Sequence, residues 1–474
     1  MISKFEIDKI DWENPDVNQV FEHFSARFDQ IDKENGQQAD VIKQQAETIR
    51  QQNELIKKLE DAILQLKTTR HTSKRSKSYN VRTFKEYPRP GKTTTKRNHN
   101  SVPVTRHEIA DILYCPTCGN LLSDITDTRT RNVEDVIDGK WQNTIWTLNR
   151  RYCKSCDKQH NGKIPGLLRY EHFGTTIMAQ IAVMRSLGIS FGKICKLIHM
   201  IYGRFISIST LENICGKVAK ICRAEYNRLV ETLRSSLAMY GDETGWFFIG
   251  KHYWVWVFRT GDTVIYHIAS TRSKLVAEAI LRDFDGIMVS DSHPIWSGVG
   301  GIHQRCLLHY FRDMYLTLKE NDSKEYKSFF NRLHKILKDA ISVWEDSNGK
   351  VSEGVIQSLQ KRLDRLASGK YDDVDCNRFA KRLQKERNQL LTFLSHDVDY
   401  HNNNSEQSLR VFANMRKILY GNRSMAGMET TETLMSIYST CEMRNINPYE
   451  FFLDHLNGVV KEIPLPKSMP AIAS

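Results

Sequence analysis

Three acidic side chains stand where the chain is expected to pass from one element to another. Asp242 lies in the β-rich run Leu237–Phe258, and Asp291 follows the short apolar run Ile287–Ser290. Glu406 falls in the first turn of a helix whose preceding asparagines can cap it. Carboxylates that meet from separate elements can hold divalent metal ions through their oxygens. We therefore predict that Asp242, Asp291 and Glu406 form a metal-dependent active site.

Such a carboxylate site suits phosphodiester chemistry. Two Mg²⁺ ions about 3.5–4 Å apart activate an oxygen nucleophile and stabilise the leaving oxygen, and Mn²⁺ can replace them. In this scheme Asp242 bridges the two ions, while Asp291 and Glu406 bind one ion each. Glu243 would point away, because neighbours on a strand face opposite sides. The competing interpretation is that each acid is an ordinary turn, cap or helix-dipole residue.

Four cysteines form the most specific local pattern. Cys115 and Cys118 make one C-x-x-C pair, Cys153 and Cys156 make a second, and 34 residues separate the pairs. Each pair offers two thiolates at the spacing that tetrahedral zinc requires, and four thiolates close its coordination shell. We expect one structural Zn²⁺ in a zinc ribbon, with His160 near enough along the chain to be considered as a ligand. The alternative is a redox dithiol or two unrelated pairs.

A sheet that could hold the carboxylates is predicted after residue 236. Leu237–Phe258 reads as two strands joined by a turn at Gly250-Lys251, of type II′ because glycine comes first. Val264–Ile268 adds a third antiparallel strand, and Lys274–Asp285 a helix before the next short strand. Three meandering strands, a helix and further short strands are the ribonuclease-H-like order. Charged amphipathic helices over Tyr326–Ser395 predict a helical insertion in this α/β core.

Between the cysteines and the sheet the pattern is helical. Apolar residues recur at spacings of three and four over Thr175–Leu187, Ser190–Tyr202 and Ser209–Arg223, with Ser207 or Ser209 as the cap of the third helix. Helix, short turn and serine-capped helix are compatible with a DNA-binding helix-turn-helix. An ordinary helical connector explains the pattern equally well.

The segment Val17–Lys67 keeps its apolar residues in one heptad register. Isoleucines fill the first position of the later heptads, from Ile42 to Ile63, which favours a parallel two-stranded coiled coil. We therefore expect a homodimer or a higher oligomer. The alternative is an amphipathic helix that packs on its own domain.

The positive charge is concentrated in one stretch. The 474 residues carry a net charge of +12, and Lys67–Arg106, with twelve Lys or Arg and one acid, accounts for +11 of it. This stretch is poor in apolar residues, so we predict a disordered linker that contacts DNA phosphates. The sequence has no apolar run of membrane-spanning length and no signal-peptide pattern in Met1–Glu13. These features predict no membrane partner and a cytoplasmic, DNA-associated protein.

The order of these features resembles the insertion-sequence-66 family of bacterial transposases. The most specific match lies near the C-terminus, in the run Asn403-Asn404-x-Glu406-x-x-x-Arg410. Further matching residues follow it, namely Arg416-Lys417, Gly427 and Asn447-Pro448-Tyr449. The resemblance spans roughly residues 17 to 456.

Two more motifs resemble those of the family, and one departs from them. Asp242-Glu243-Thr244 resembles its first catalytic motif, and Cys306-x-x-His309-x-x-Arg312 resembles its strand-to-helix signature. Ser290-Asp291-Ser292 stands where the family more often has Asp-Gly-Tyr. His309, Arg312 and Arg410 would support the carboxylates or contact DNA phosphates, unless they only satisfy polar groups in the core.

The resemblance implies a DDE-type DNA transposase. Such an enzyme binds the double-stranded ends of an insertion sequence, cuts there with Mg²⁺ and joins the 3′ hydroxyl to target DNA, with small accessory proteins encoded alongside. One alternative is a catalytically inactive, transposase-derived DNA-binding or regulatory protein. Another is a structure-specific nuclease that performs no strand transfer.

The expected architecture is an α/β ribonuclease-H-like catalytic core with an α-helical insertion, preceded by a coiled coil and a zinc ribbon. The predicted segments, in chain order, are the coiled coil 1–67, basic linker 68–107, zinc ribbon 108–165, helical DNA-binding segment 166–235, catalytic domain 236–425 with its insertion at about 320–398, and C-terminal helical segment 426–474.

Overall fold

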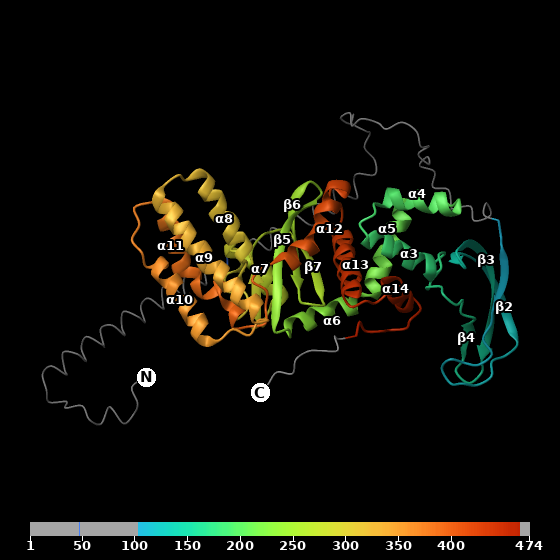
Figure 1. Cartoon of the computed structure of the whole chain (residues 1–474). Helices are drawn as coiled ribbons and strands as arrows, with labels where there is room; N and C mark the ends of the chain where they lie inside the picture. Colours follow the sequence, from blue (N-terminus) through green and yellow to red (C-terminus); the bar gives the residue numbers. More distant parts are fainter. Residues whose placement is uncertain (1–46, 48–102, 465–474) are drawn as a thin grey trace, which may run out of the picture. The chain divides into compact units, whose positions relative to one another are not determined.

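The computed structural model describes Glu47 and residues 103–464 (Figure 1). Apart from Glu47, the predicted coiled coil lies outside the described residues, and so does nearly all of the predicted basic linker. The elements reported below belong to one compact unit, Lys96–Ser474. Two sheets and a set of helices make this unit a mixed α/β protein. Among its described helices, none has the length and apolarity needed to cross a membrane.

A five-stranded sheet forms the centre of the unit. Its strands, in the order β7-β6-β5-β8-β9, are β7 (Val264–Ala269), β6 (Lys251–Arg259), β5 (Ala238–Phe248), β8 (Ile287–Ser290) and β9 (Ile302–Arg305). The pairs β7–β6 and β6–β5 are antiparallel, whereas β5–β8 and β8–β9 are parallel. Helix α7 (Lys274–Leu281) connects β7 to β8 and makes the crossover that a parallel strand requires.

The hairpin between β5 and β6 turns one residue earlier than the sequence indicated. Phe248 pairs with Lys251, so Ile249 and Gly250 are the two central residues of the turn. Both have positive φ, 48° and 77°, which is the combination of a type I′ turn. The predicted type II′ turn at Gly250-Lys251 was wrong. Ile249 is β-branched, and such residues are rarely found at positive φ, so the sequence did not suggest a turn centred on it.

The two faces of the central sheet bury different clusters. On one face, Trp246 and Val257 pack against Phe412 of α12 (Asn403–Leu419) and Met428 of α13 (Met425–Met443). On the other face lie the neighbouring residues of β6, such as Trp256 and Phe258. They join a larger cluster with Trp296 and the helices between residues 175 and 234. Alternation along each strand therefore decides which helices a side chain meets.

Three long helices lie between β9 and α12 in the chain. They follow α8 (Leu307–Glu320) and are α9 (Lys324–Asp346), α10 (Glu353–Ala367) and α11 (Val374–Leu390). Their apolar faces, including Phe329, Leu363 and Phe379, close a separate core with α8. This helical bundle occupies the range in which the sequence predicted an insertion, and Figure 1 shows it beside the strands.

Four helices lie in the described stretch between residues 162 and 237, and Ser207 caps the third of them as predicted. They are α3 (Thr175–Ser186), α4 (Phe191–Tyr202), α5 (Ile208–Ile221) and α6 (Arg223–Arg234). The Ser207 hydroxyl accepts from the backbone N–H of Thr210 at 3.2 Å. Helix α5 packs against α3 and α13, and the last helix, α14 (Pro448–Leu456), packs against α3.

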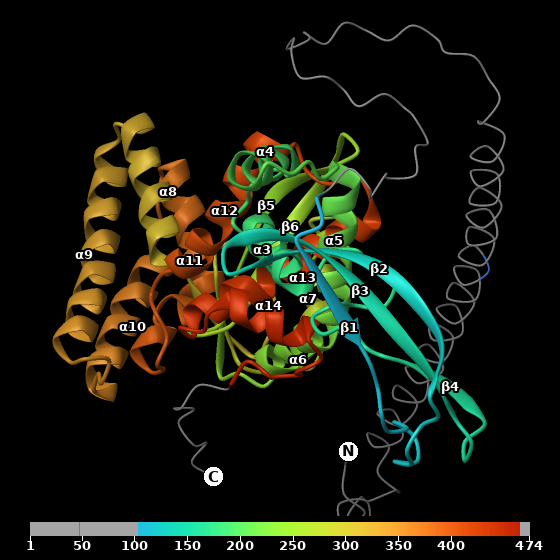
Figure 2. The same ribbon diagram turned by 90° about the vertical axis from the view of Figure 1, so that its right-hand side faces the viewer.

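A second sheet precedes these helices and is dominated by one long hairpin (Figure 2). Its strands are β1 (Arg106–Ala110), β2 (Ile125–Ile137), β3 (Lys140–Cys153) and β4 (Lys158–Asn161). Asp138 and Gly139, both at positive φ, form the turn between β2 and β3. An Asp-Gly pair between strand-like runs is a strong hairpin signal, and it could have located this turn from the sequence.

Candidate active site

Asp242 lies in the middle of β5, not at its end as the sequence suggested. The parallel partner β8 pairs only with Ala238–Tyr240, and β5 continues to Phe248 alongside β6 alone. Asp242 thus sits just past the point where the parallel pairing stops. Its register partner is Val257, whose side chain belongs to the cluster under α12, so Asp242 faces the α12 side of the sheet.

The surroundings of Asp242 favour its protonated form. Burial, together with the negative charges of Glu243, Asp291 and Glu406, raises the pKa of this carboxyl group to about 8. One backbone hydrogen bond, from Glu243 N–H to Asp242 Oδ1 at 2.9 Å, acts in the opposite direction. A bound cation would reverse the effect of burial, because it stabilises the ionised form.

Asp291 follows β8, and its backbone is fixed by a buried arginine. Arg305, at the end of β9, donates from Nη1 to the carbonyl of Asp291 at 2.8 Å and to Ser290 Oγ at 3.2 Å. The Asp291 carboxylate accepts from the backbone N–H of His293 at 2.9 Å. Arg305 is 2% exposed, so the loop that presents Asp291 is anchored from inside the protein.

Glu406 lies in the first turn of α12, which is joined to β5 by Asn402. The Asn402 side chain does not cap α12 as predicted, although the residue occupies the N-cap position. Its Nδ2 instead donates to the carbonyl of Gly241 at 2.8 Å, and its backbone N–H contacts Cys306 Sγ at 3.3 Å. Asn402 therefore connects α12, β5 and the start of α8.

The three residues predicted to support the carboxylates occupy different settings. His309, on α8, places Nε2 at 3.7 Å from Glu406 Oε1. Arg312 and Arg410 are exposed, one turn beyond His309 and Glu406 on their own helices. The structure thus brings His309 to Glu406, while the two arginines face the surface.

Glu243 occupies the opposite face of β5. Its carboxylate forms an ion pair with Arg272 and accepts from Trp296 Nε1 at 3.0 Å. Burial raises the pKa of Glu243 to about 7, although Arg272 opposes the shift. Alternation of strand residues predicted that this side chain points away from Asp242, and the structure adds that it makes a structural contact. Arg272, Arg305 and Asn402 are positioning residues that sequence reasoning missed, because their partners lie far away in the chain.

The carboxylates are close enough to interact but do not form a tight cage. Within residues 103–464, the oxygens of the three carboxylates do not all lie within 4.8 Å of one another. Polar atoms in the same elements are buried and lack a hydrogen-bond partner within the described chain, namely Ser292 Oγ, His309 Nδ1, Asn402 Oδ1 and Ser405 Oγ. Carboxylate oxygens together with such atoms suit a hydrated, hard divalent cation.

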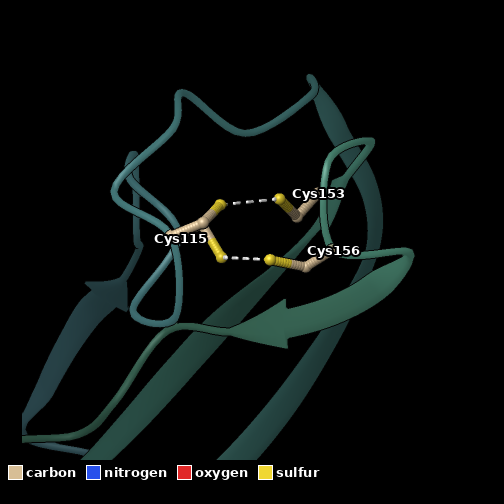
Figure 3. A group of neighbouring side chains, drawn as sticks. Cys115, Cys153 and Cys156 are labelled. Atoms are coloured by element: carbon tan, nitrogen blue, oxygen red, sulfur yellow. Dashed lines mark hydrogen bonds between the residues drawn. The ribbon is translucent and has the colours of Figure 1, made fainter.

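The four predicted cysteine ligands come together at the end of the second sheet. Their sulfur atoms all lie within 4.8 Å of one another, with 3.9 Å between Cys115 and Cys156 and 3.6 Å between Cys118 and Cys153. Figure 3 shows Cys115 facing Cys153 and Cys156 across the gap between two loops. His160 Nε2 lies 3.4 Å from Cys115 Sγ. This cluster could hold a zinc ion.

Two tight loops create the cysteine cluster. In the first, the backbone N–H of Gly119 bonds to the carbonyl of Cys115 at 2.9 Å, and Gly119 has a φ of 75° that glycine adopts without strain. The second loop connects β3 to β4. Burial raises the pKa of Cys115, but backbone N–H groups of Cys118 and Thr117 and the neighbouring thiols outweigh it and lower the pKa to about 6.

The fold and the site together define an α/β protein with a carboxylate-lined site on its central sheet and a separate four-cysteine cluster. A family model described as "Transposase IS66 family" matches residues 171–430, a range that includes all three carboxylates. This range is more than half of the chain, and the chain belongs to that family. The resemblance inferred from the sequence motifs is confirmed.

A second comparison finds a relative that is similar to part of the chain. It is "Uncharacterized protein y4jO" of Sinorhizobium fredii (strain NBRC 101917 / NGR234), 29% identical over 108 residues. The matched part is 23% of this chain and 34% of that protein. The chain therefore spans about a third of the length of this relative.

Proposed function

We propose that this protein is a DDE-type DNA transposase that cuts DNA at the ends of an insertion sequence and joins them to target DNA. The observation that carries the proposal is the placement of Asp242, Asp291 and Glu406. They come from three separate elements inside the family match, and the charges of Asp291 and Glu406 act on Asp242. Separate turn or cap roles would not require these three acids to lie close enough for their charges to interact.

The sheet order supports a ribonuclease-H-like core. Along the chain, three antiparallel strands, a helix and two further short strands follow one another as the sequence predicted. In the sheet these strands lie in the order β7-β6-β5-β8-β9. The first acid lies on the central strand, the second follows the adjacent parallel strand, and the third begins a helix that covers β5. The helical bundle α9–α11 separates the second acid from the third in the chain.

Asp242, Asp291 and Glu406 would hold two Mg²⁺ ions, with Mn²⁺ as a substitute. Bound there, the ions would activate an oxygen nucleophile and stabilise the leaving oxygen. The residues around them set the geometry. Arg305 fixes the backbone of Asp291, and Asn402 ties the helix of Glu406 to β5. His309, beside Glu406, would orient that carboxylate.

Cys115, Cys118, Cys153 and Cys156 would bind one Zn²⁺ with a structural role. Four thiolates fill a tetrahedral shell and leave no open position for a substrate. The ion would join the two loops at the end of the second sheet, which supports the zinc-ribbon assignment. The sulfur-to-sulfur distances given above suit this interpretation better than a redox pair, because the two C-x-x-C loops face each other.

The partners follow from the same proposal. Double-stranded DNA, as element ends and as target, would be the substrate in the cytoplasm. Self-association through residues 17–67 and phosphate contacts from residues 67–106 remain predictions, since nearly all of these residues lie outside the described part of the chain. The domain boundaries, the helix-turn-helix and the small accessory proteins likewise remain predictions.

Cleavage and joining of labelled DNA test the proposal. The protein is incubated with labelled candidate element ends, target DNA and Mg²⁺, and nicked and joined products are separated by size. We expect both products from the wild type, and neither from Asp242→Asn, Asp291→Asn or Glu406→Gln, with Mn²⁺ partly restoring the last variant. Glu429→Gln, an exposed acid on α13, is the matched control.

The outcomes separate the alternatives. Binding of the ends without any cutting would favour an inactive, transposase-derived DNA-binding protein. Cutting without joined products would favour a structure-specific nuclease. Normal cutting by all three carboxylate variants would show that these residues are not the catalytic site.

A further inference from the structure

A basic cleft lies between α5 and the connection from α12 to α13. Its volume is about 610 Å³, and α5 and the first turns of α13 form its walls. The described residues that line it include four cations, Arg185, Lys217, Lys220 and Arg423, and a single acid, Glu212. Figure 1 shows α5 and α13 side by side. The cleft is therefore suited to a polyanion.

The wall opposite α5 is held rigidly. Asn422 is buried, and its Oδ1 accepts from Trp246 Nε1 at 2.8 Å while its backbone N–H bonds to the carbonyl of Phe247 at 2.9 Å. Gly421 has a φ of 89°, and a Cβ there would lie 1.9 Å from that carbonyl oxygen. The loop is thus clamped to the end of β5, and this fixes the place of the adjacent Arg423.

Two of the four cations are free to bind a ligand. The Arg185 guanidinium makes a cation–π contact with the Phe191 ring, 4.7 Å away, and Lys217 forms an ion pair with Glu171. Lys220 and Arg423 are exposed. In the part of the chain that the structure describes, the side chain of neither residue forms an ion pair or a hydrogen bond.

A row of exposed polar side chains on α12 connects this cleft to the carboxylates. Arg410, Asn414 and Lys417 are exposed, and their spacings of four and three place them on one face of the helix. The rise of an α-helix puts Lys417 about 17 Å from Glu406 along the axis. Soon after Lys417 the chain enters the wall of the cleft at Leu419.

We propose that the α12 row (Arg410, Asn414 and Lys417) and the basic cleft together bind the phosphate backbone of the DNA duplex that flanks the cleavage point. This inference rests on the proposed function and names the surface that aligns its substrate. A span of about 17 Å corresponds to about five base pairs of duplex. A small anion would fill the cleft alone and would leave the α12 row without a role.

The salt dependence of DNA binding tests this surface. The double variant Lys220→Gln/Arg423→Gln removes the two free cations, and Lys361→Gln/Lys385→Gln removes two exposed lysines of α10 and α11 as a matched control. Binding of a labelled duplex is measured over a range of salt concentrations. Loss of two phosphate contacts should lower the magnitude of the log–log slope by about 2 and weaken binding roughly tenfold or more at moderate salt. The control should match the wild type.

Trimming the DNA locates the contact. For the wild type, shortening the flank to within about five base pairs of the cleavage point should reduce the slope by a similar amount. For the cleft variant, the same trimming should change little, since the contact is already lost.

Measurements of DNA binding and of DNA cutting distinguish failure of the proposed phosphate-binding surface from failure of the proposed function. A cleft variant with the slope and affinity of the wild type would overturn the inference, while metal-dependent cutting that requires Asp242 would leave the function standing. Wild-type protein that neither binds nor cuts DNA would overturn both. Because Lys220 and Arg423 are exposed, both variants should unfold at the wild-type temperature, and this is checked by circular dichroism.

Discussion

The side-chain amide of Asn402 donates a hydrogen bond to the carbonyl of Gly241, 2.8 Å away and 161 residues earlier in the chain. This bond joins the residue before the first turn of α12 to the residue before Asp242. It therefore sets the position of Glu406 relative to Asp242, which no local sequence pattern determines. The distance between the two acids depends on a buried polar contact as well as on apolar packing.

Asn402→Ala should lower both stability and activity. The change leaves the buried Gly241 carbonyl without its partner, a loss of about 1–3 kcal/mol in the free energy of unfolding. Cutting of element ends should fall further than stability alone explains, because α12 is no longer tied to β5. Thermal unfolding and cleavage rates measure the two effects. Gln407→Ala, an exposed residue of α12, is the control, and an Asn402→Ala enzyme with wild-type cutting would contradict the positioning role.

The pH dependence of stability should report on Asp242. Its pKa is raised to about 8, so between about pH 4 and pH 8 the folded protein holds a proton that the unfolded chain releases. The contribution of protonated Asp242 to the free energy of unfolding is therefore lost as the pH rises from about 4 to about 8. Asp242→Asn should match the wild type near pH 4 and be more stable near pH 8, by about 1.4 kcal/mol for each pH unit between the pKa values of the folded and unfolded states. Urea unfolding at a series of pH values measures the difference.

Added Mg²⁺ distinguishes a metal site from burial alone. At pH 8 the ion should raise the unfolding temperature of the wild type, because it stabilises the ionised carboxylate. It should have little effect on Asp242→Asn. Equal stabilisation of both proteins would show that Mg²⁺ binds elsewhere.

Sequence patterns predicted the features that depend on neighbours in the chain. Short-range spacing predicted the strands β5, β6 and β7 and the serine N-cap of α5. It also predicted that the two cysteines of each C-x-x-C pair lie close enough to bind one ion. The division of Asp242 and Glu243 between opposite faces follows from strand alternation in the same way.

The remaining features depend on long-range pairing. Asp242 is in mid-strand because β5 stays paired with β6 as far as Phe248. The distant partner β8 pairs with only three residues of β5, and strand patterns do not reveal where such a partner ends. The roles of Arg305 and Asn402 arise from partners on other elements. Alternation alone would make Glu243→Gln an inert control for the carboxylate variants. The ion pair with Arg272 makes it unsuitable, because removing that charge leaves a partly buried arginine uncompensated.

The cysteine cluster predicts one zinc ion per chain. Cys118→Ser removes one of four ligands, so the purified variant should contain much less zinc than the wild type by elemental analysis. The two loops of the second sheet should then become sensitive to protease. Cys195→Ser, a half-buried thiol on α4, should retain full zinc. Wild-type protein without zinc would contradict the assignment.

Gly421→Ala should destabilise the fold from the loop between α12 and α13. The added Cβ would meet the Phe247 carbonyl oxygen at 1.9 Å, and the φ of 89° is one that alanine adopts only with strain. The backbone must move away from β5, which also disturbs the Asn422 contacts. We expect a loss of about 2 kcal/mol or more in the free energy of unfolding.

Gly192→Ala, in α4, is the control for Gly421→Ala, since no atom lies within 4 Å of its added Cβ. Because Gly192 lies in a helix, this substitution should be neutral or stabilising by up to about 1 kcal/mol. Both values are measured by denaturant unfolding, and equal midpoints for the two variants would show that the loop yields without cost.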